Sequence, residues 1–146
     1  MKSFLVVASL IAACFAQGIQ IGAPLPGSNI PANTNFTVEV DRPESLTGSE
    51  EVAIIIAMTS CPDTGCDDPT FNVANDIGIV LYEGPYNPQF DNSSPPDHKP
   101  PYQNFTFPVP RNFADGSEVM LSVTHLSIVA AGSILFEIKN ETLNVV

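Results

Sequence analysis

Few side chains in this 146-residue sequence could do acid-base chemistry at neutral pH. Of its two histidines, His98 lies among prolines next to Lys99, and His125 ends an alternating set of apolar residues. These positions favour a solvated His98 and a buried, structural His125. The sequence has no Gly-x-Ser-x-Gly elbow, phosphate-binding glycine loop or His-Glu-x-x-His motif. We therefore predict no catalytic residues, no cofactor and a protein that is not an enzyme.

Acidic side chains are the second group that could carry chemistry. Asp63, Asp67 and Asp68 lie within six positions of one another, and Asp76 follows. Clustered carboxylates can bind calcium, and paired carboxylates can hydrolyse glycosides. A calcium loop also needs regularly spaced oxygens and a turn glycine, for which Gly65 is the only hint. A solvated acidic loop without metal is the preferred interpretation, and calcium or glycosidase chemistry stays open as an alternative.

The first sixteen residues have the pattern of a secretory signal peptide. Lys2 precedes an apolar run that extends from Phe4 to Ala13, and a small residue, Ala16, ends the segment. The run is shorter than the roughly 20 residues that a spanning helix needs. We predict cleavage after residue 16, a single mature domain over residues 17–146, and a secreted, extracellular protein without membrane insertion.

Secretion changes how the cysteines are interpreted. Removal of Cys14 leaves Cys61 and Cys66, which in an oxidising compartment are expected to form a disulfide, with two free thiols as the alternative. Glycosylation sequons, which suit the same pathway, begin at Asn35, Asn92, Asn104 and Asn140.

The charge balance excludes two classes of partner. The chain carries 16 acidic and 5 basic residues, a formal net charge of −11, and removal of Lys2 makes it one unit more negative. Nucleic acids and anionic membrane surfaces are bound by clustered cations. We predict neither as a partner.

Alternating and β-branched residues predict strands throughout the mature chain. The clearest is 35–41, where Phe36, Val38 and Val40 alternate with polar residues, and three consecutive isoleucines favour a central strand over 51–58. Prolines restrict the segment near 19–21 to a sheet edge and the segment 104–109 to an edge or a bulge. With about seven strands and no convincing helix, the expected fold is an all-β, antiparallel immunoglobulin-like or fibronectin-like sandwich. The expected strands are 19–21, 35–41, 51–58, 77–82, 104–109, 118–126 and 134–145.

A proline-rich connection of roughly twenty residues separates the strands at 77–82 and 104–109, and such long loops are usually functional or disordered. Tyrosine supplies contact area and a polar tip at low entropic cost, and flanking prolines stiffen the loop before binding. We predict a protein-binding surface here, with a carbohydrate or cell-wall glycan as the alternative partner. The rings could instead plug the end of the sandwich. The candidate binding residues are Tyr82, Tyr86, Asn87, Phe90 and Tyr102.

Three segments also carry a family resemblance: GIVLYEGPYNP at 78–88, PYQNFT at 101–106 and LSVTHLSIVAAG at 121–132. In these segments the chain resembles small secreted proteins of filamentous fungi and, through them, the necrosis-inducing secreted protein family of fungal effectors. The resemblance implies a host-facing protein that binds immune receptor kinases of the plant cell surface. It brings no catalytic residues with it.

Overall fold

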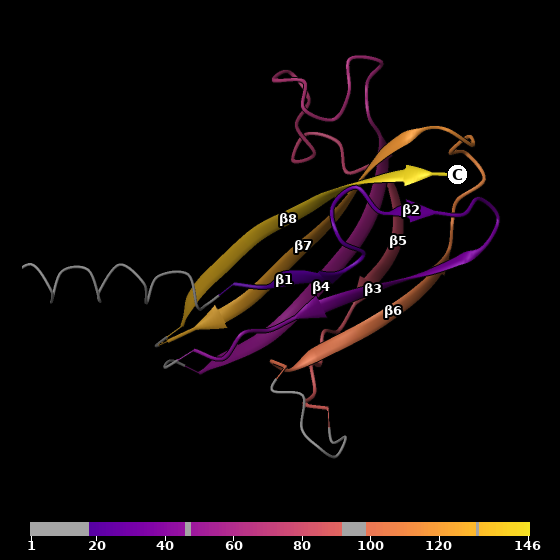
Figure 1. Ribbon diagram of the computed structural model, residues 1–146. Coiled ribbons are helices and arrows are strands. Elements are labelled where there is room, and N and C mark those ends of the chain that lie inside the picture. Colours follow the sequence, from indigo (N-terminus) through magenta and orange to yellow (C-terminus); the bar gives the residue numbers. More distant parts are fainter. Residues whose placement is uncertain (1–17, 46–47, 92–98, 131) are drawn as a thin grey trace, which may run out of the picture.

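The computed structural model describes residues 18–45, 48–91, 99–130 and 132–146, and within these ranges the chain forms eight strands and no helix. Figure 1 shows them as two layers. One layer is a three-stranded sheet in the order β1-β3-β6, and the other is a five-stranded sheet in the order β2-β8-β7-β4-β5. The strands are β1 (Gln20–Ala23), β2 (Asn29–Ile30), β3 (Asn35–Asp41), β4 (Ser49–Ser60), β5 (Ile79–Gly84), β6 (Tyr102–Pro108), β7 (Glu118–Val129) and β8 (Ser133–Val145).

The core forms between the two layers from apolar residues that the strands turn inward. In β3, Val38 and Val40 are buried while Asn35 and Thr37 are exposed, and Val38 lies opposite Phe105 of β6. Each such side chain contributes about 1.5–3 kcal/mol when it is fully buried. The β7 residues that face this core are Val119, Leu121, Val123 and His125, all 0% exposed. The all-β sandwich predicted from the sequence is confirmed.

The outer face of the five-stranded sheet is only partly covered. The loop between β4 and β5 packs Cys66 and Val73 against Met120 in a second apolar cluster. Further along the same sheet, Phe136 of β8 lies opposite Leu126 of β7 and is 63% exposed. This arrangement leaves an exposed phenylalanine on β8, which β7 and β4 separate from β5 in the sheet order.

Several sequence predictions are confirmed by the sheet order, and two details differ. β1 and β6 are the edges of the three-stranded sheet, and β4 is internal to the other sheet, as expected. The sequence did not predict β2, which pairs parallel to the end of β8, because two residues show no periodicity. Strand β5 begins at Ile79 and not at Ile77, since Gly78 adopts a φ of 75° before it.

The predicted signal peptide, residues 1–16, lies outside the described residues. The same holds for the predictions at Asn92 and His98. Among the residues that are described, none belongs to a helix long and apolar enough to cross a bilayer.

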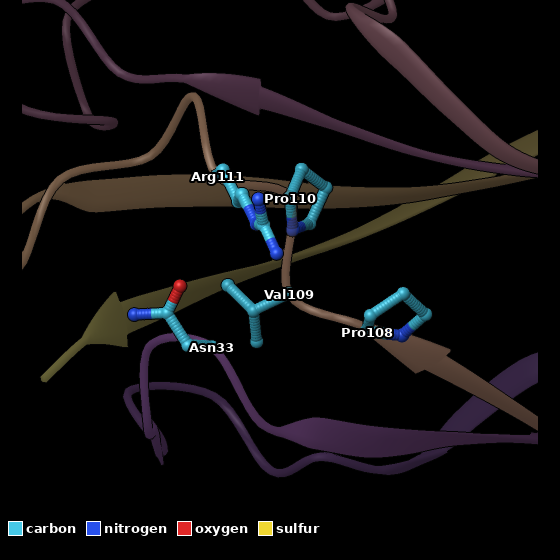
Figure 2. A pocket seen from close by; sticks show the side chains of 5 residues that line it. All are labelled: Asn33, Pro108, Val109, Pro110 and Arg111. Atoms are coloured by element: carbon cyan, nitrogen blue, oxygen red, sulfur yellow. The ribbon is translucent and has the colours of Figure 1, made fainter.

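The two ends of β6 lead to different surface features. At Tyr102 the strand continues from the proline-rich loop, and at Pro108 it runs into a cavity of about 310 Å³ lined by Asn33, Val109, Pro110 and Arg111 as well as Pro108 (Figure 2). Seven residues of strand place these two features roughly 20 Å apart.

Candidate functional site

The arms of the β5–β6 loop are paired with each other beyond the edge of the sandwich. Gln89 and Tyr102 exchange two backbone hydrogen bonds of 2.9 and 3.0 Å. The backbone N–H of Asn87 donates to Oε1 of Gln103 at 2.7 Å, and the Gln89 amide nitrogen donates to Oδ1 of Asn87 at 2.9 Å. The arms are therefore ordered by direct contacts.

Tyr86 is buried in the core and does not lie on the loop surface, so for this ring the alternative of packing into the sandwich applies. The side chain is 3% exposed, its hydroxyl donates to the Val40 carbonyl at 3.0 Å, and it belongs to the main core cluster. A tyrosine ring that is buried with its hydroxyl satisfied removes a large apolar area from water without leaving a polar group unpaired. Burial, and then the nearby Glu51 carboxylate, raise the pKa of the Tyr86 phenol. In this arrangement Tyr86 fixes the loop to the sandwich and cannot touch a partner.

The other candidate binding residues differ in how much of their side chain is available. Tyr82 is half-buried against Phe105, with ring centroids 4.8 Å apart, and its hydroxyl donates to the Pro85 carbonyl at 2.9 Å. Tyr102 is also half-buried. Asn87 is exposed, and Phe90 is 54% exposed. Phe90 is thus the most accessible of the four aromatic candidates.

Lys99 lies on the second arm of the loop. Its ammonium group is 4.7 Å from the centroid of the Tyr102 ring and 2.5 Å from Oε1 of Glu39. Lys99 therefore contacts both Tyr102, at the start of β6, and Glu39 of β3.

A buried group of charged side chains lies beside Tyr86. The Tyr86 ring stands edge-on to His125, whose two ring nitrogens face carboxylates on both sides. The Nδ1–H of His125 donates to Oε1 of Glu137 at 3.1 Å, and its Nε2–H donates to Oε2 of Glu51. Arg42 completes the group, with its Nε 2.8 Å from Oε1 of Glu51. Because both ring nitrogens must donate, this geometry requires the doubly protonated, cationic imidazole.

A β-bulge in β4 makes this arrangement possible. Glu51 pairs with Ser127 of β7, and two residues later Ala53 pairs with Leu126, so Val52 is the extra residue. In a regular strand without the bulge, Glu51 would lie three positions before Ile54 and therefore on the opposite face. The bulge leaves Val52 exposed and turns the Glu51 carboxylate inward toward His125.

Hydrogen bonds decide the ionisation of this buried group. Burial opposes ionisation of Glu51, but hydrogen bonds from His125 and Arg42 outweigh it and lower its pKa to about 2. Burial likewise opposes ionisation of Glu137, and the bonds from His125 and the Ile19 backbone N–H lower its pKa below the usual value. For His125, burial would lower the pKa, but the hydrogen bonds to Glu137 and Glu51 prevail and raise it.

The buried group stabilises the fold and is closed to substrates. His125 is 0% exposed and both of its nitrogens are occupied, so it cannot exchange a proton with a bound molecule in this arrangement. The structural role predicted for His125 is confirmed. The sequence did not reveal its partners Glu51 and Glu137. Glu137, for example, is in register with His125 only once β7 and β8 pair.

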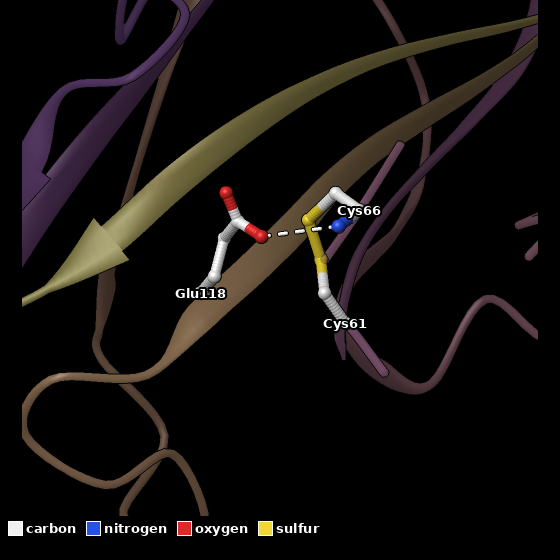
Figure 3. Close-up of side chains that lie close together, drawn as sticks. All are labelled: Cys61, Cys66 and Glu118. Carbon is white, nitrogen blue, oxygen red and sulfur yellow. Dashed lines mark hydrogen bonds between the residues drawn. A yellow bond between two sulfur atoms is a disulfide. The ribbon is translucent and has the colours of Figure 1, made fainter. Parts of the chain in front are cut away.

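The acidic loop is closed by the predicted disulfide. Cys61 and Cys66 are bonded, with Cα atoms 4.8 Å apart, and Oε2 of Glu118 accepts a hydrogen bond from the Cys66 backbone N–H at 3.0 Å (Figure 3). Both sulfurs are consumed in the bond, so they are not available as thiolate ligands for a metal at this cluster. Glu118 ties the loop to the start of β7.

The side chain of Asp68, in the same loop, forms hydrogen bonds within its own turn. Its carboxylate accepts hydrogen bonds from the hydroxyl groups of Thr64 and Thr70 and from the Thr70 backbone N–H. These bonds lower the pKa of Asp68 to about 2. The loop contacts thus favour a structural role for this acid.

Comparisons with solved structures give only distant similarities. Superoxide reductase (neelaredoxin) from Ignicoccus hospitalis is 14% identical, with 86% of this chain and 80% of that chain covered and a TM-score of 0.44. A single-substitution variant of that reductase is 16% identical, with 99% and 100% covered and a TM-score of 0.47. Murine CRIg is 10% identical, with 88% and 98% covered and a TM-score of 0.47. Scores this low carry no argument about activity.

The sequence comparisons are more decisive. Curated protein sequences give no match. The family model of the Nis1 family matches residues 15–144, which include every described strand except the last residue of β8. The family resemblance inferred from the sequence is thereby confirmed, and the chain belongs to the Nis1 family.

Proposed function

We propose that this protein is a secreted fungal effector that binds a host protein through the exposed residues of its β5–β6 loop. Asn87 and Phe90 form the centre of the contact, and Tyr102 contributes the exposed part of its ring. The observation that carries the proposal is the exposure of Phe90, 54%, on an arm whose backbone is paired with the opposite arm. A large ring at the surface of an ordered loop is the kind of residue that dominates binding energy in protein interfaces.

The fixed backbone supports this proposal energetically. Binding normally costs about 0.5–1.5 kcal/mol for each flexible side chain that must be immobilised, and more where a loop must become ordered. The Gln89–Tyr102 backbone pair and the buried Tyr86 ring already order the arms before a partner arrives. Because less free energy is needed to order the loop, more of the favourable contact energy at Phe90 contributes to the affinity.

We further propose that the partner is a host immune receptor kinase, as membership of the Nis1 family suggests, and that the protein acts without catalysis. The support for the second point is that His125 is 0% exposed, with both ring nitrogens facing carboxylates. The net charge of −11 favours a partner surface with cationic groups around the Phe90 contact.

A capture experiment tests the proposal. The secreted protein is incubated separately with purified host immune receptor kinases and with insoluble chitin, glucan and cellulose. The expected result is retention by a kinase, loss of retention in Phe90→Ala, and no loss in the control Phe136→Ala, which removes a similarly exposed ring on β8. Retention on a polysaccharide that depends on Phe90 would replace the protein partner with the carbohydrate alternative.

A further inference from the structure

Among the described residues, Arg111 lacks the carboxylate partner that the other arginine and the lysines have. Arg42, Lys99 and Lys139 lie 2.8, 2.5 and 3.4 Å from the carboxylates of Glu51, Glu39 and Glu137, respectively. Within the described residues, Arg111 makes no ion pair or hydrogen bond through its guanidinium group. An unneutralised arginine is unusual where acids outnumber bases by 16 to 5.

Arg111 lines the cavity at the far end of β6. Two turns form this cavity, one at 31–34 and one at 110–113, and the Val109 N–H joins them by donating to the Thr34 carbonyl at 2.9 Å. In Figure 2 the two prolines, Pro108 and Pro110, lie to one side of Val109 and Asn33 lies to the other. The cavity thus has a backbone frame that does not depend on the β5–β6 loop.

The lining has separate apolar and polar parts. Proline rings and the Val109 methyl groups make an apolar wall, and prolines carry no N–H to donate. The hydrogen-bond donors come from the guanidinium of Arg111 and the carboxamide of Asn33, which has no hydrogen-bond partner among the described residues. Asn33 has a φ of 60°, a conformation that asparagine tolerates better than most residues.

We propose that this cavity binds a carboxylate carried on a small apolar body, with the Arg111 guanidinium pairing with the carboxylate and the proline wall contacting the body. A guanidinium matches a carboxylate through two parallel hydrogen bonds. The volume, about 310 Å³, lies at the small end of the range for ligand pockets and suits a ligand of about one ring. The site is at the opposite end of β6 from the proposed effector surface and does not depend on it.

Charge favours a carboxylate over a phosphate at this position. A phosphate dianion is best bound by several donors and cations, whereas Arg111 is one cation beside an apolar wall. The acidic chain also repels a dianion more strongly than a monoanion. The expected ligand is therefore singly charged.

The test is a titration followed by amide NMR, with benzoate, the uncharged benzamide and acetate as probes. Benzoate is expected to give saturable shifts at Asn33, Val109 and Arg111. Benzamide, which lacks the charge, and acetate, which lacks the apolar body, are each expected to bind at least about tenfold more weakly. A parallel titration with N-acetyl-leucine shows whether a peptide C-terminus is preferred to a free small acid, and saturable binding of either one supports the proposal.

Variants connect the binding to Arg111. Arg111→Gln should weaken benzoate binding by about tenfold or more, Arg111→Lys should bind with intermediate affinity, and the control Lys139→Gln should bind like the wild type. Melting temperatures should agree between the wild type and the Arg111 variants, because Arg111 is exposed and has no partner among the described residues to lose. Equal binding of benzoate and benzamide, unchanged binding in Arg111→Gln, or shifts that do not saturate would each overturn the proposal.

Discussion

The ring of Tyr86 stands edge-on to the imidazole of His125, with centroids 5.6 Å apart and planes at 79°. This contact joins the β5–β6 loop to the buried charged group, because Tyr86 belongs to the loop and His125 to the centre of β7. The same tyrosine donates its hydroxyl to Val40 of β3. One side chain therefore bridges the loop and both sheets, and it determines how the exposed arm is placed.

Substitutions at Tyr86 should show, through the free energy of unfolding, that this residue belongs to the core. Tyr86→Ala removes a buried aromatic ring, and it is expected to lower the free energy of unfolding by about 3–5 kcal/mol. Tyr86→Phe keeps the ring and loses only the hydrogen bond to Val40, an expected cost of about 1 kcal/mol. Urea unfolding measures both values. Wild-type stability in Tyr86→Ala would show that the ring does not pack in the core.

The stability of the protein should be greatest between about pH 4.5 and 6.5. The Glu51 pKa is lowered from 4.5 to about 2 in the fold, so its contribution is complete above pH 4.5 and is lost as the pH falls toward 2. The His125 pKa is raised above 6.5, so its contribution is complete below pH 6.5 and is lost as the pH rises through the folded pKa. Urea midpoints measured across the acidic and alkaline sides of this window give the profile.

A histidine variant serves as the control for that profile. His125→Gln removes the titrating group between two buried carboxylates, and breaking such a pair costs about 3–5 kcal/mol. The variant should be less stable than the wild type within the window and should no longer lose stability as the pH rises above 6.5. If both proteins lost the same stability above pH 6.5, the loss would come from a titrating group other than His125.

Loss of the disulfide should have a small and local effect. For a loop as short as that between Cys61 and Cys66, the loop-entropy model gives about 2 kcal/mol. The double variant Cys61→Ser with Cys66→Ser should stay folded with a lower melting temperature, and hydrogen exchange should increase mainly in the loop between β4 and β5. Exchange that increases equally throughout the sandwich would contradict a local role.

Glycans are expected on three described asparagines. Asn35, Asn104 and Asn140 are all exposed, and the first two lie on the outer face of the three-stranded sheet. Peptide mapping of protein secreted by a fungal host, after enzymatic deglycosylation in heavy-oxygen water, should show labelled aspartate at these positions. Unlabelled asparagine at all three positions would show that this prediction is wrong.

The strands were predictable from the sequence because their side chains alternate. The expected strand at 35–41 agrees with β3 at both ends, and β7 begins at Glu118 as expected. Period-two patterns of this kind depend only on neighbouring residues and on one buried face.

The candidate site was less predictable because it depends on irregular backbone. The bulge at Val52 reverses the expected side of Glu51, and no local pattern in the isoleucine-rich segment shows it. The burial of Tyr86 arises inside a proline-rich loop that has no period. The pairing of His125 with Glu137 depends on the register between β7 and β8. The two residues are not neighbours in the sequence, so a local pattern does not show that they meet.

The proposed binding surface is the exposed part of the β5–β6 loop. The dissociation constant of the kinase complex, measured for two matched variants, tests this surface. Loss of a central aromatic contact typically costs about 2 kcal/mol or more. Phe90→Ala should therefore bind about thirtyfold more weakly than the wild type, or weaker still. Phe136→Ala, which removes a similarly exposed ring on β8, should bind as the wild type does. Unchanged binding in Phe90→Ala, with weaker binding in Phe136→Ala, would place the binding surface outside the β5–β6 loop.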